Sequence, residues 1–172
     1  MLDVGCGVGH GGAALRAARP ETELVGFDCV AERVARLPEG VYADAAVGDA
    51  GALPFDDGAF DAVVAGEFVE HLAPHDVDSV LSGFPRVLRP GGLLLLTTPN
   101  PDGLRWRLRG VSPGDDPSHL SVHSRRDLEA RLQRLGFTRL RVRGSGRVTR
   151  LIGDRVPVLS LYQSYLVVAT RP

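Results

Sequence analysis

Three aspartates stand at or just after short apolar runs in the first fifty residues: Asp3, Asp28 and Asp49. A carboxylate at the end of a strand can accept hydrogen bonds from hydroxyl or amine groups and can pair with a cation. We expect Asp3 to hold a cationic group such as the ammonium of an amino acid. Asp28 is placed to accept from ribose hydroxyls, and Asp49 could accept from the exocyclic amine of an adenine.

Glycines alternate with other residues directly after the first apolar run, in the segment GCGVGHGG. Gly7, Gly9 and Gly12 match the pattern GxGxxG, in which bare backbone lets a bulky cofactor approach and the next helix offers free N–H groups. Together with the three carboxylates, this turn favours an adenosine that carries a charged amino acid. That chemistry describes S-adenosylmethionine better than NAD, for which the glycine pattern is the only support.

A second group of residues that could do chemistry lies in the segment GEFVEHL. If this segment is helical, Glu67, Glu70 and His71 lie on one face, at spacing i, i+3, i+4. His119 is the candidate partner from a later loop, although His123 could take its place. His71 and His119 could remove the proton of an acceptor hydroxyl. Alternatively, the set could hold Mg²⁺ or a similar hard ion that acidifies the hydroxyl, or it could line a pocket that uses no metal.

Alternating strands and helices must position these residues. Apolar runs predict seven strands, over residues 2–4, 23–28, 41–50, 60–66, 93–98, 137–144 and 165–171. Helical spacing and terminators predict helices over residues 12–19, 31–37, 77–88 and 124–136. The alternation indicates an α/β fold, with a Rossmann-like, doubly wound, mostly parallel seven-stranded sheet and helices on both faces. The runs 60–66 and 93–98 are apolar enough for buried strands.

The length of the chain indicates a single domain over residues 1–172. Two stretches break the rhythm of strands and helices, 99–123 and 145–163, and we expect them to be substrate loops or a lid. No apolar run approaches the roughly 18 residues that span a membrane, so we expect no membrane span and a cytoplasmic protein. Cys6 and Cys29 suit free thiols and lack a zinc-binding spacing.

Charge divides the chain into two halves. Residues 1–101 carry six arginines against fifteen acids, a net charge of −9, whereas residues 102–172 carry fourteen arginines against six acids, a net charge of +8. The basic half could face an anionic partner, but arginines of this kind are more often a solvated surface. We therefore expect a small-molecule partner rather than nucleic acid. The sequence leaves the oligomeric state open.

Four segments in this order carry a family resemblance: LDVGCGVG, GFD, GDAGALPFDDGAFDAVVAGEFVEHL and VLRPGGLLLLTTPNP. Together they resemble the ordered motifs of the class I S-adenosylmethionine-dependent methyltransferases of the small-molecule type. The ExxEH run is similar to that of the ubiquinone-biosynthesis O-methyltransferases and to the metal-binding set of the small-RNA 2′-O-methyltransferases. Members of the family normally carry helices before the first strand, and this chain begins inside that strand, so we expect a chain short at its N-terminus.

The resemblance also implies roles for individual residues. Asp3, Gly5, Gly7 and Gly9 would lie around the methionine part of S-adenosylmethionine. Asp28 would bind its ribose, Asp49 with the Ala50 backbone its adenine, and Glu67 would line the pocket. The ligands of a bound Mg²⁺ would be Glu67, Glu70, His71 and His119.

The function expected from these features is transfer of a methyl group to an oxygen of a small molecule, such as a phenol, quinone precursor, sugar or secondary metabolite. An RNA 2′-O-methyltransferase is the first alternative, favoured by the basic second half and the ExxEH segment. An NAD-binding oxidoreductase and a truncated, non-catalytic remnant that only binds the cofactor are the others. The remnant is considered because the helices that normally precede the first strand are missing from this sequence.

Overall fold

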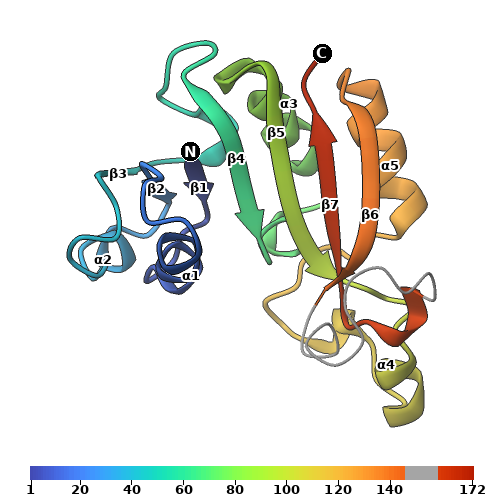
Figure 1. The fold of residues 1–172 in the computed structure, drawn as a ribbon. Helices are drawn as coiled ribbons and strands as arrows, with labels where there is room; N and C mark the ends of the chain where they lie inside the picture. Colours follow the sequence, from blue (N-terminus) through green and yellow to red (C-terminus); the bar gives the residue numbers. More distant parts are fainter. Residues whose placement is uncertain (146–158) are drawn as a thin grey trace.

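The computed structural model describes residues 1–145 and 159–172 (Figure 1). Its seven strands form one sheet in the order β3-β2-β1-β4-β5-β7-β6. They are β1 Leu2–Val4, β2 Val25–Asp28, β3 Asp44–Val47, β4 Phe60–Gly66, β5 Leu88–Pro99, β6 Thr138–Ser145 and β7 Ser164–Thr170. The strands β1 to β5 pair in parallel, and β7 lies antiparallel between β5 and β6. The predicted mostly parallel α/β sheet is therefore confirmed.

Five α-helices and four short 3-10 helices connect the described strands. The α-helices are α1 His10–Ala18, α2 Ala31–Val34, α3 Val77–Val87, α4 Leu104–Arg109 and α5 Arg125–Arg134. The 3-10 helices are η1 Ala50–Ala52, η2 Val69–His71, η3 Pro113–Asp115 and η4 Leu159–Leu161. Of the predicted loops, 99–123 contains α4 and η3, whereas most of 145–163 lies outside the described residues.

Local signals account for the helix ends. The Ser124 side chain accepts a hydrogen bond from the Asp127 backbone N–H at 3.1 Å and caps α5, as its position in the sequence predicted. The helix predicted over 31–37 is wrong in its length, because α2 ends at Val34. Pro38 disfavours the α conformation at the residue before it, so the chain continues in tighter turns instead.

The main core lies between the sheet and α3. Four of the five apolar residues predicted to share one face of this helix are buried on it: Val77, Val80, Leu81 and Phe84. The fifth, Leu88, is also buried, but it is the first residue of β5. In Figure 1, α3 and α5 lie behind β4, β5, β7 and β6, while α1 and α2 lie beside β1, β2 and β3.

The opposite face of β5 is only partly covered. Leu94 and Leu96 are fully buried, but Leu93 is 41% exposed and Leu95 is half-buried. The prediction of a uniformly buried strand over 93–98 is therefore wrong for Leu93. Successive side chains of a strand point to opposite faces, and in the described part of the chain α3 and α5 cover only one of them.

The strand order reverses at β1, which pairs with β2 on one side and β4 on the other. Ligands of open α/β sheets bind beyond the carboxyl ends of the strands at such a point. The glycine turn follows β1, Asp28 ends β2, Asp49 follows β3 and Glu67 follows β4, so the topology brings these predicted site residues to one edge. No helix in the described part of the chain combines the length and apolarity that crossing a bilayer requires.

Candidate cofactor and acceptor site

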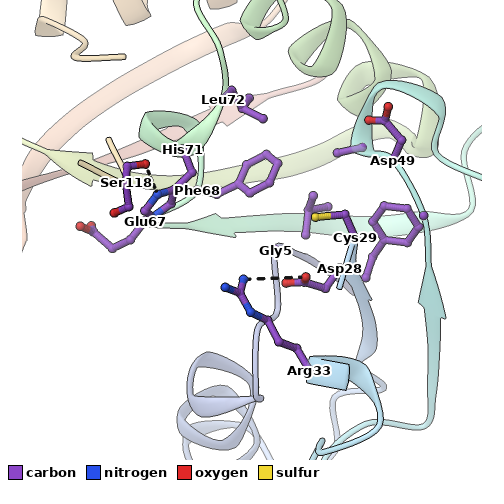
Figure 2. Close-up of a pocket in the computed structure, with 14 residues that line it drawn as sticks. Gly5, Asp28, Cys29, Arg33, Asp49, Glu67, Phe68, His71, Leu72 and Ser118 are labelled. Carbon is purple, nitrogen blue, oxygen red and sulfur yellow. Dashed lines mark hydrogen bonds and ion pairs between the residues drawn. The ribbon is translucent and has the colours of Figure 1, made fainter. Parts of the chain in front are cut away.

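A pocket of about 440 Å³ lies at the carboxyl ends of the first four strands (Figure 2). Each of these strands or the turn after it contributes to the walls. The lining residues are Val4, Gly5, Phe27, Asp28, Cys29, Arg33, Gly48, Asp49, Ala50, Glu67, Phe68, His71, Leu72 and Ser118. In Figure 2, Glu67, His71 and Ser118 lie on one side of the pocket and Asp49 lies on the other.

Asp28 joins the glycine turn to the end of β2. Its Oδ2 accepts a hydrogen bond from the Gly7 backbone N–H, and its Oδ1 accepts one from the Val30 N–H, both at 2.9 Å. The side chain is buried, and an Arg33 guanidinium nitrogen lies 4.0 Å from Oδ1. A carboxylate offers about four lone-pair sites, so both oxygens can accept further bonds from a ligand's hydroxyls.

The glycine turn lets the backbone itself form a wall of the pocket. Gly5 has a φ of +72°, a conformation that L side chains rarely adopt, and a Cβ there would lie 2.5 Å from Cδ2 of Phe68. The backbone of Gly5 thus forms the pocket wall with the Phe68 ring against it. Gly9 is buried and Gly7 is half-buried in the same turn, and the turn opens onto the N-terminus of α1.

Asp3 faces a different hollow from the other two aspartates. It lines a second pocket of about 380 Å³ with Gly5, Gly7 and the start of α1, and does not line the first pocket. Its Oδ2 accepts a hydrogen bond of 2.7 Å from the Tyr42 hydroxyl. Burial raises the pKa of Asp3, the Tyr42 hydrogen bond opposes this shift, and the charge of Asp28 adds to it. The two pockets share Gly5 and Arg33, so the glycine turn separates them.

Tyr42→Phe tests this buried contact. We expect the free energy of unfolding to fall by about 1–3 kcal/mol at pH 7, because the ionised Asp3 loses a donor in a desolvated place. Without the donor the folded-state pKa of Asp3 rises further. The stability of the variant should therefore decline more than that of wild type as the pH rises from the unfolded-state pKa to the folded-state pKa, and should level off above it. The destabilisation should therefore shrink at acid pH, where Asp3 is protonated in both folded and unfolded chains.

Urea denaturation at several pH values measures this effect. A double-mutant cycle with Asp3→Asn isolates the contribution of the Tyr42–Asp3 pair, since Tyr42→Phe should lower the free energy of unfolding by less in the Asp3→Asn background. Equal costs in both backgrounds, or a cost that does not change with pH, would show that the hydroxyl does not stabilise the carboxylate.

Asp49 and Ala50 lie together where β3 ends. Asp49 is exposed, and its Oδ1 accepts a hydrogen bond of 2.8 Å from the Gly51 N–H, which caps the N-terminus of η1. Both residues line the first pocket. Asp49 therefore stands on the opposite side of the pocket from Glu67 (Figure 2).

Glu67 has an unusual backbone for a residue that is not glycine. Its φ is +47°, and its N–H is held by the carbonyl oxygen and the hydroxyl of Thr97, at 2.9 Å and 3.0 Å. Left-handed backbone at such a residue costs energy and concentrates at functional sites. One Glu67 carboxylate oxygen lies 3.5 Å from the Ser164 hydroxyl.

The GEFVEHL segment is not an α-helix, and only Val69–His71 forms a single 3-10 turn. Leu72 after it is extended, so the predicted face with spacing i, i+3, i+4 does not form. Glu70 turns inward and is buried, whereas Glu67 stays at the pocket rim. The Thr98 hydroxyl donates to Oε2 of Glu70 at 3.0 Å, and burial raises the pKa of this carboxyl to about 7.

Glu70, His71 and His119 come together in space. One potential ligand atom of each lies within 4.8 Å of the others, and the two imidazole rings meet edge to face with centroids 5.2 Å apart. Glu67 is not part of this group, so the four-residue set expected for Mg²⁺ is not assembled. His123 does not replace His119, because it is buried with its Nε2 2.8 Å from the Ser121 hydroxyl.

This donor set does not fit Mg²⁺. Magnesium prefers oxygen ligands in a near-octahedral arrangement, and here two of the three donors are imidazole nitrogens. We therefore assign no step of the chemistry to Mg²⁺.

Four residues that touch the predicted ones were not anticipated: Arg33, Tyr42, Phe68 and Ser118. Arg33 lies five residues after Asp28, on α2, so their closeness in sequence was a weak indication that the two side chains are near each other. The other three reach the site from distant or irregular segments, for which no periodic pattern exists.

Residues 2–96 match the family described as Methyltransferase domain. The malonyl-[acyl-carrier protein] O-methyltransferase of Methylococcus capsulatus is 35% identical over 154 residues, which cover 83% of this chain and 53% of that protein. The fatty-acid O-methyltransferase of Mycolicibacterium smegmatis is 40% identical over 105 residues, which cover 59% of this chain and 37% of that protein.

Among solved structures, a SAM-dependent methyltransferase from Archaeoglobus fulgidus superposes with a TM-score of 0.76 at 24% identity, over 98% of this chain and 84% of that one. The chain spans about half the length of the first curated relative it matches. The family match covers more than half of the chain, and the fold and the glycine turn agree with it. The chain thus belongs to the class I S-adenosylmethionine-dependent methyltransferases, with S-adenosylmethionine as its cofactor.

Proposed function

We propose that this chain transfers a methyl group to a carboxylate oxygen of an acyl substrate. The observation that carries the proposal is one pocket in which strand-end aspartates face a wall of Glu67, His71 and Ser118. The names of two relatives add support, since a malonyl thioester and a fatty acid both carry a free carboxylate. The chain spans only part of those proteins, so this substrate class is our inference for this chain.

The cofactor-binding residues act by position. S-Adenosylmethionine, when bound, supplies a methyl group on a sulfonium. Asp28 is assigned to the ribose hydroxyls and Asp49 with Ala50 to the adenine. Asp3 is assigned to the ammonium group, which would lie in the second pocket on the other side of the glycine turn. The shared wall at Gly5 then sets where the sulfonium lies relative to the acceptor, and such alignment is the main requirement of an in-line displacement.

The kind of acceptor decides whether the protein must move a proton. A carboxylate is ionised at neutral pH and needs only orientation, whereas a hydroxyl acceptor needs a base. His71 is the imidazole that lines the pocket, and its Nδ1 lies 2.8 Å from the Ser118 carbonyl oxygen. Because a carbonyl only accepts, Nδ1 carries the hydrogen and Nε2 is free to act as that base.

His71→Asn separates the two kinds of acceptor. With a carboxylate acceptor we expect kcat to fall less than about tenfold, because no proton is removed. With a hydroxyl acceptor the loss would reach about 10²–10⁴-fold, the usual contribution of a general base. Transfer of labelled methyl groups to a fatty acid, a malonyl thioester, a phenol and an RNA measures both cases. Turnover of the phenol or RNA alone would refute the carboxylate proposal.

The surface around α4 fits delivery of the acyl group by an acidic carrier protein. A groove there is lined by Leu104, Arg105, Leu108, Arg109 and Leu161. Leu108 is 78% exposed, and neither arginine forms an ion pair with a described residue. Figure 1 places α4 at the end of the sheet where β4 and β5 finish. Apolar contacts surrounded by unpaired guanidinium groups complement an acidic protein surface.

Reversing both charges tests the carrier surface. Arg105→Glu/Arg109→Glu should raise KM for a carrier-linked malonyl group at least about fivefold while leaving KM for a free fatty acid unchanged. Arg141→Glu, an exposed arginine on β6, is the matched control. An equal rise in KM for both substrates would place the two arginines in the acceptor pocket instead. An unchanged KM for the carrier-linked substrate would refute the proposed carrier-binding surface.

A further inference from the structure

We propose that Ser121 and His123 are positioning residues for methyl transfer, because they fix the 3-10 turn η2 that carries His71 into the pocket wall. Both belong to the irregular segment 118–123, which lies between η3 and α5. His123 is buried, and the chemistry assigned above does not use it. The inference concerns the acceptor side of the pocket, and it therefore rests on the proposed function.

Ser121 binds the backbone of η2 at two consecutive residues. Val69 and Glu70 are buried, and the carbonyl oxygens of buried residues are normally hydrogen-bonded. The backbone N–H of Ser121 donates to the Glu70 carbonyl oxygen, and the Ser121 hydroxyl donates to the Val69 carbonyl oxygen, both at 3.1 Å. A residue about fifty positions along the chain thus holds the turn in place.

His123 orients the Ser121 hydroxyl and links it to α5. Its Nε2 lies 2.8 Å from the Ser121 hydroxyl oxygen and 3.4 Å from the Val69 carbonyl oxygen. On the other side of the ring, Nδ1 lies 3.4 Å from Oδ2 of Asp127, which also accepts from Nε of Arg131 at 3.1 Å. Only 3% of His123 is exposed, so packing and two polar neighbours restrict the ring to one orientation.

The same segment also reaches the pocket directly. Nδ1 of His71 lies 2.8 Å from the Ser118 carbonyl oxygen, and both residues line the pocket (Figure 2). Segment 118–123 therefore contacts η2 at its first, second and third residues. A misplacement of about 1 Å at such a wall can slow a transfer roughly 100-fold, because the acceptor leaves the line of the displacement.

The contacts of the two side chains lie away from the cofactor. In the described part of the chain, Ser121 and His123 bond to each other, to η2 and to Asp127. None of these partners is among the residues assigned to S-adenosylmethionine. Losing either side chain should therefore affect the transfer step and not the binding of the cofactor.

Substitution of each side chain tests this role. Ser121→Ala and His123→Phe should each lower kcat for methyl transfer to a fatty acid at least about tenfold while leaving the Kd for S-adenosylmethionine unchanged. Amide hydrogen exchange over residues 66–73 should accelerate about fivefold or more, because the turn loses partners of its carbonyl oxygens. His123→Gln should recover most of kcat, since its amide nitrogen can reach the place of Nε2.

Ser124→Ala is the matched control for Ser121→Ala. The Ser124 hydroxyl accepts from the Asp127 N–H at the start of α5 and, among the described residues, from no part of η2. This variant should melt at a lower temperature than wild type but keep its kcat and the exchange of residues 66–73.

Three results would overturn the proposal: wild-type exchange in Ser121→Ala, the same losses in Ser124→Ala, or a Kd for S-adenosylmethionine that rises as much as kcat falls. If His123→Phe does not fold, Ser121→Ala and His123→Gln still decide the outcome. A wild-type chain that leaves fatty acids unmethylated would refute the carboxylate proposal instead. The exchange of residues 66–73 needs no acceptor, so it would still decide whether Ser121 and His123 hold the turn.

Discussion

Asp28→Ala is expected to raise the Kd for S-adenosylmethionine roughly 100-fold or more. The carboxylate accepts backbone N–H bonds from Gly7 and Val30, so it holds the glycine turn against β2 as well as lining the pocket. Hydrogen bonds to a charged group contribute about 1.5–3 kcal/mol each, and two of them hold the turn in place. Their loss should therefore disorder the turn and remove the acceptor assigned to the ribose.

Calorimetric titration with S-adenosylmethionine measures the change. Asp44→Ala is the matched control, because Asp44 is exposed at the start of β3, and among the described residues its Oδ1 accepts only from the next residue's N–H. Asp28→Asn is informative as well, since its amide keeps one acceptor oxygen and should bind better than the alanine variant. If Asp28→Ala bound the cofactor as tightly as Asp44→Ala does, the assignment of the ribose to this carboxylate would be abandoned.

Gly5→Ala is expected to lower the free energy of unfolding by about 3 kcal/mol and to weaken cofactor binding. Two costs add up at this position. The left-handed backbone disfavours any Cβ by about 1–2 kcal/mol, and overpacking adds about 1–3 kcal/mol. The overpacking arises because the new Cβ would lie 2.5 Å from the Phe68 ring. Displacing that ring would also reshape the pocket that it lines.

Another glycine allows the two costs to be separated. Gly91 has a φ of +77°, close to the +72° of Gly5, but nothing lies within 4 Å of the Cβ it would gain. Gly91→Ala should therefore show the backbone cost alone. Phe68→Ala in the Gly5→Ala background should recover part of the stability, because the contact is removed. Equal losses in Gly5→Ala and Gly91→Ala would show that the ring moves aside freely.

Local patterns predicted much of the architecture. The apolar run 60–66 is β4, the spacing of Val77, Val80, Leu81 and Phe84 is the buried face of α3, and Ser124 caps α5. Each of these signals acts within a few residues of the chain, where backbone geometry alone relates sequence to structure. The ordered motifs also predicted the family, which the comparison with known families confirmed.

The site was harder to predict than the fold. The sequence placed Asp28, Asp49 and Glu67 at strand ends, and they do line one pocket, but their assigned roles toward the cofactor stay predictions. It could not show that Glu70 separates from Glu67, because the 3-10 turn at Val69–His71 replaced the helix on which their shared face depended. It also could not choose between His119 and His123.

By itself, then, the sequence determined the α/β fold, the family and the set of polar residues brought to the carboxyl edge of the sheet. Only the tertiary structure decided which of them meet: Tyr42 bonds Asp3 across 39 positions, and His71 bonds Ser118 across 47. The physical reason is that hydrogen-bond and packing partners so far apart in the chain are selected by how whole elements pack. A periodic pattern reports which face of an element is buried, and not which side chain from another element it will touch.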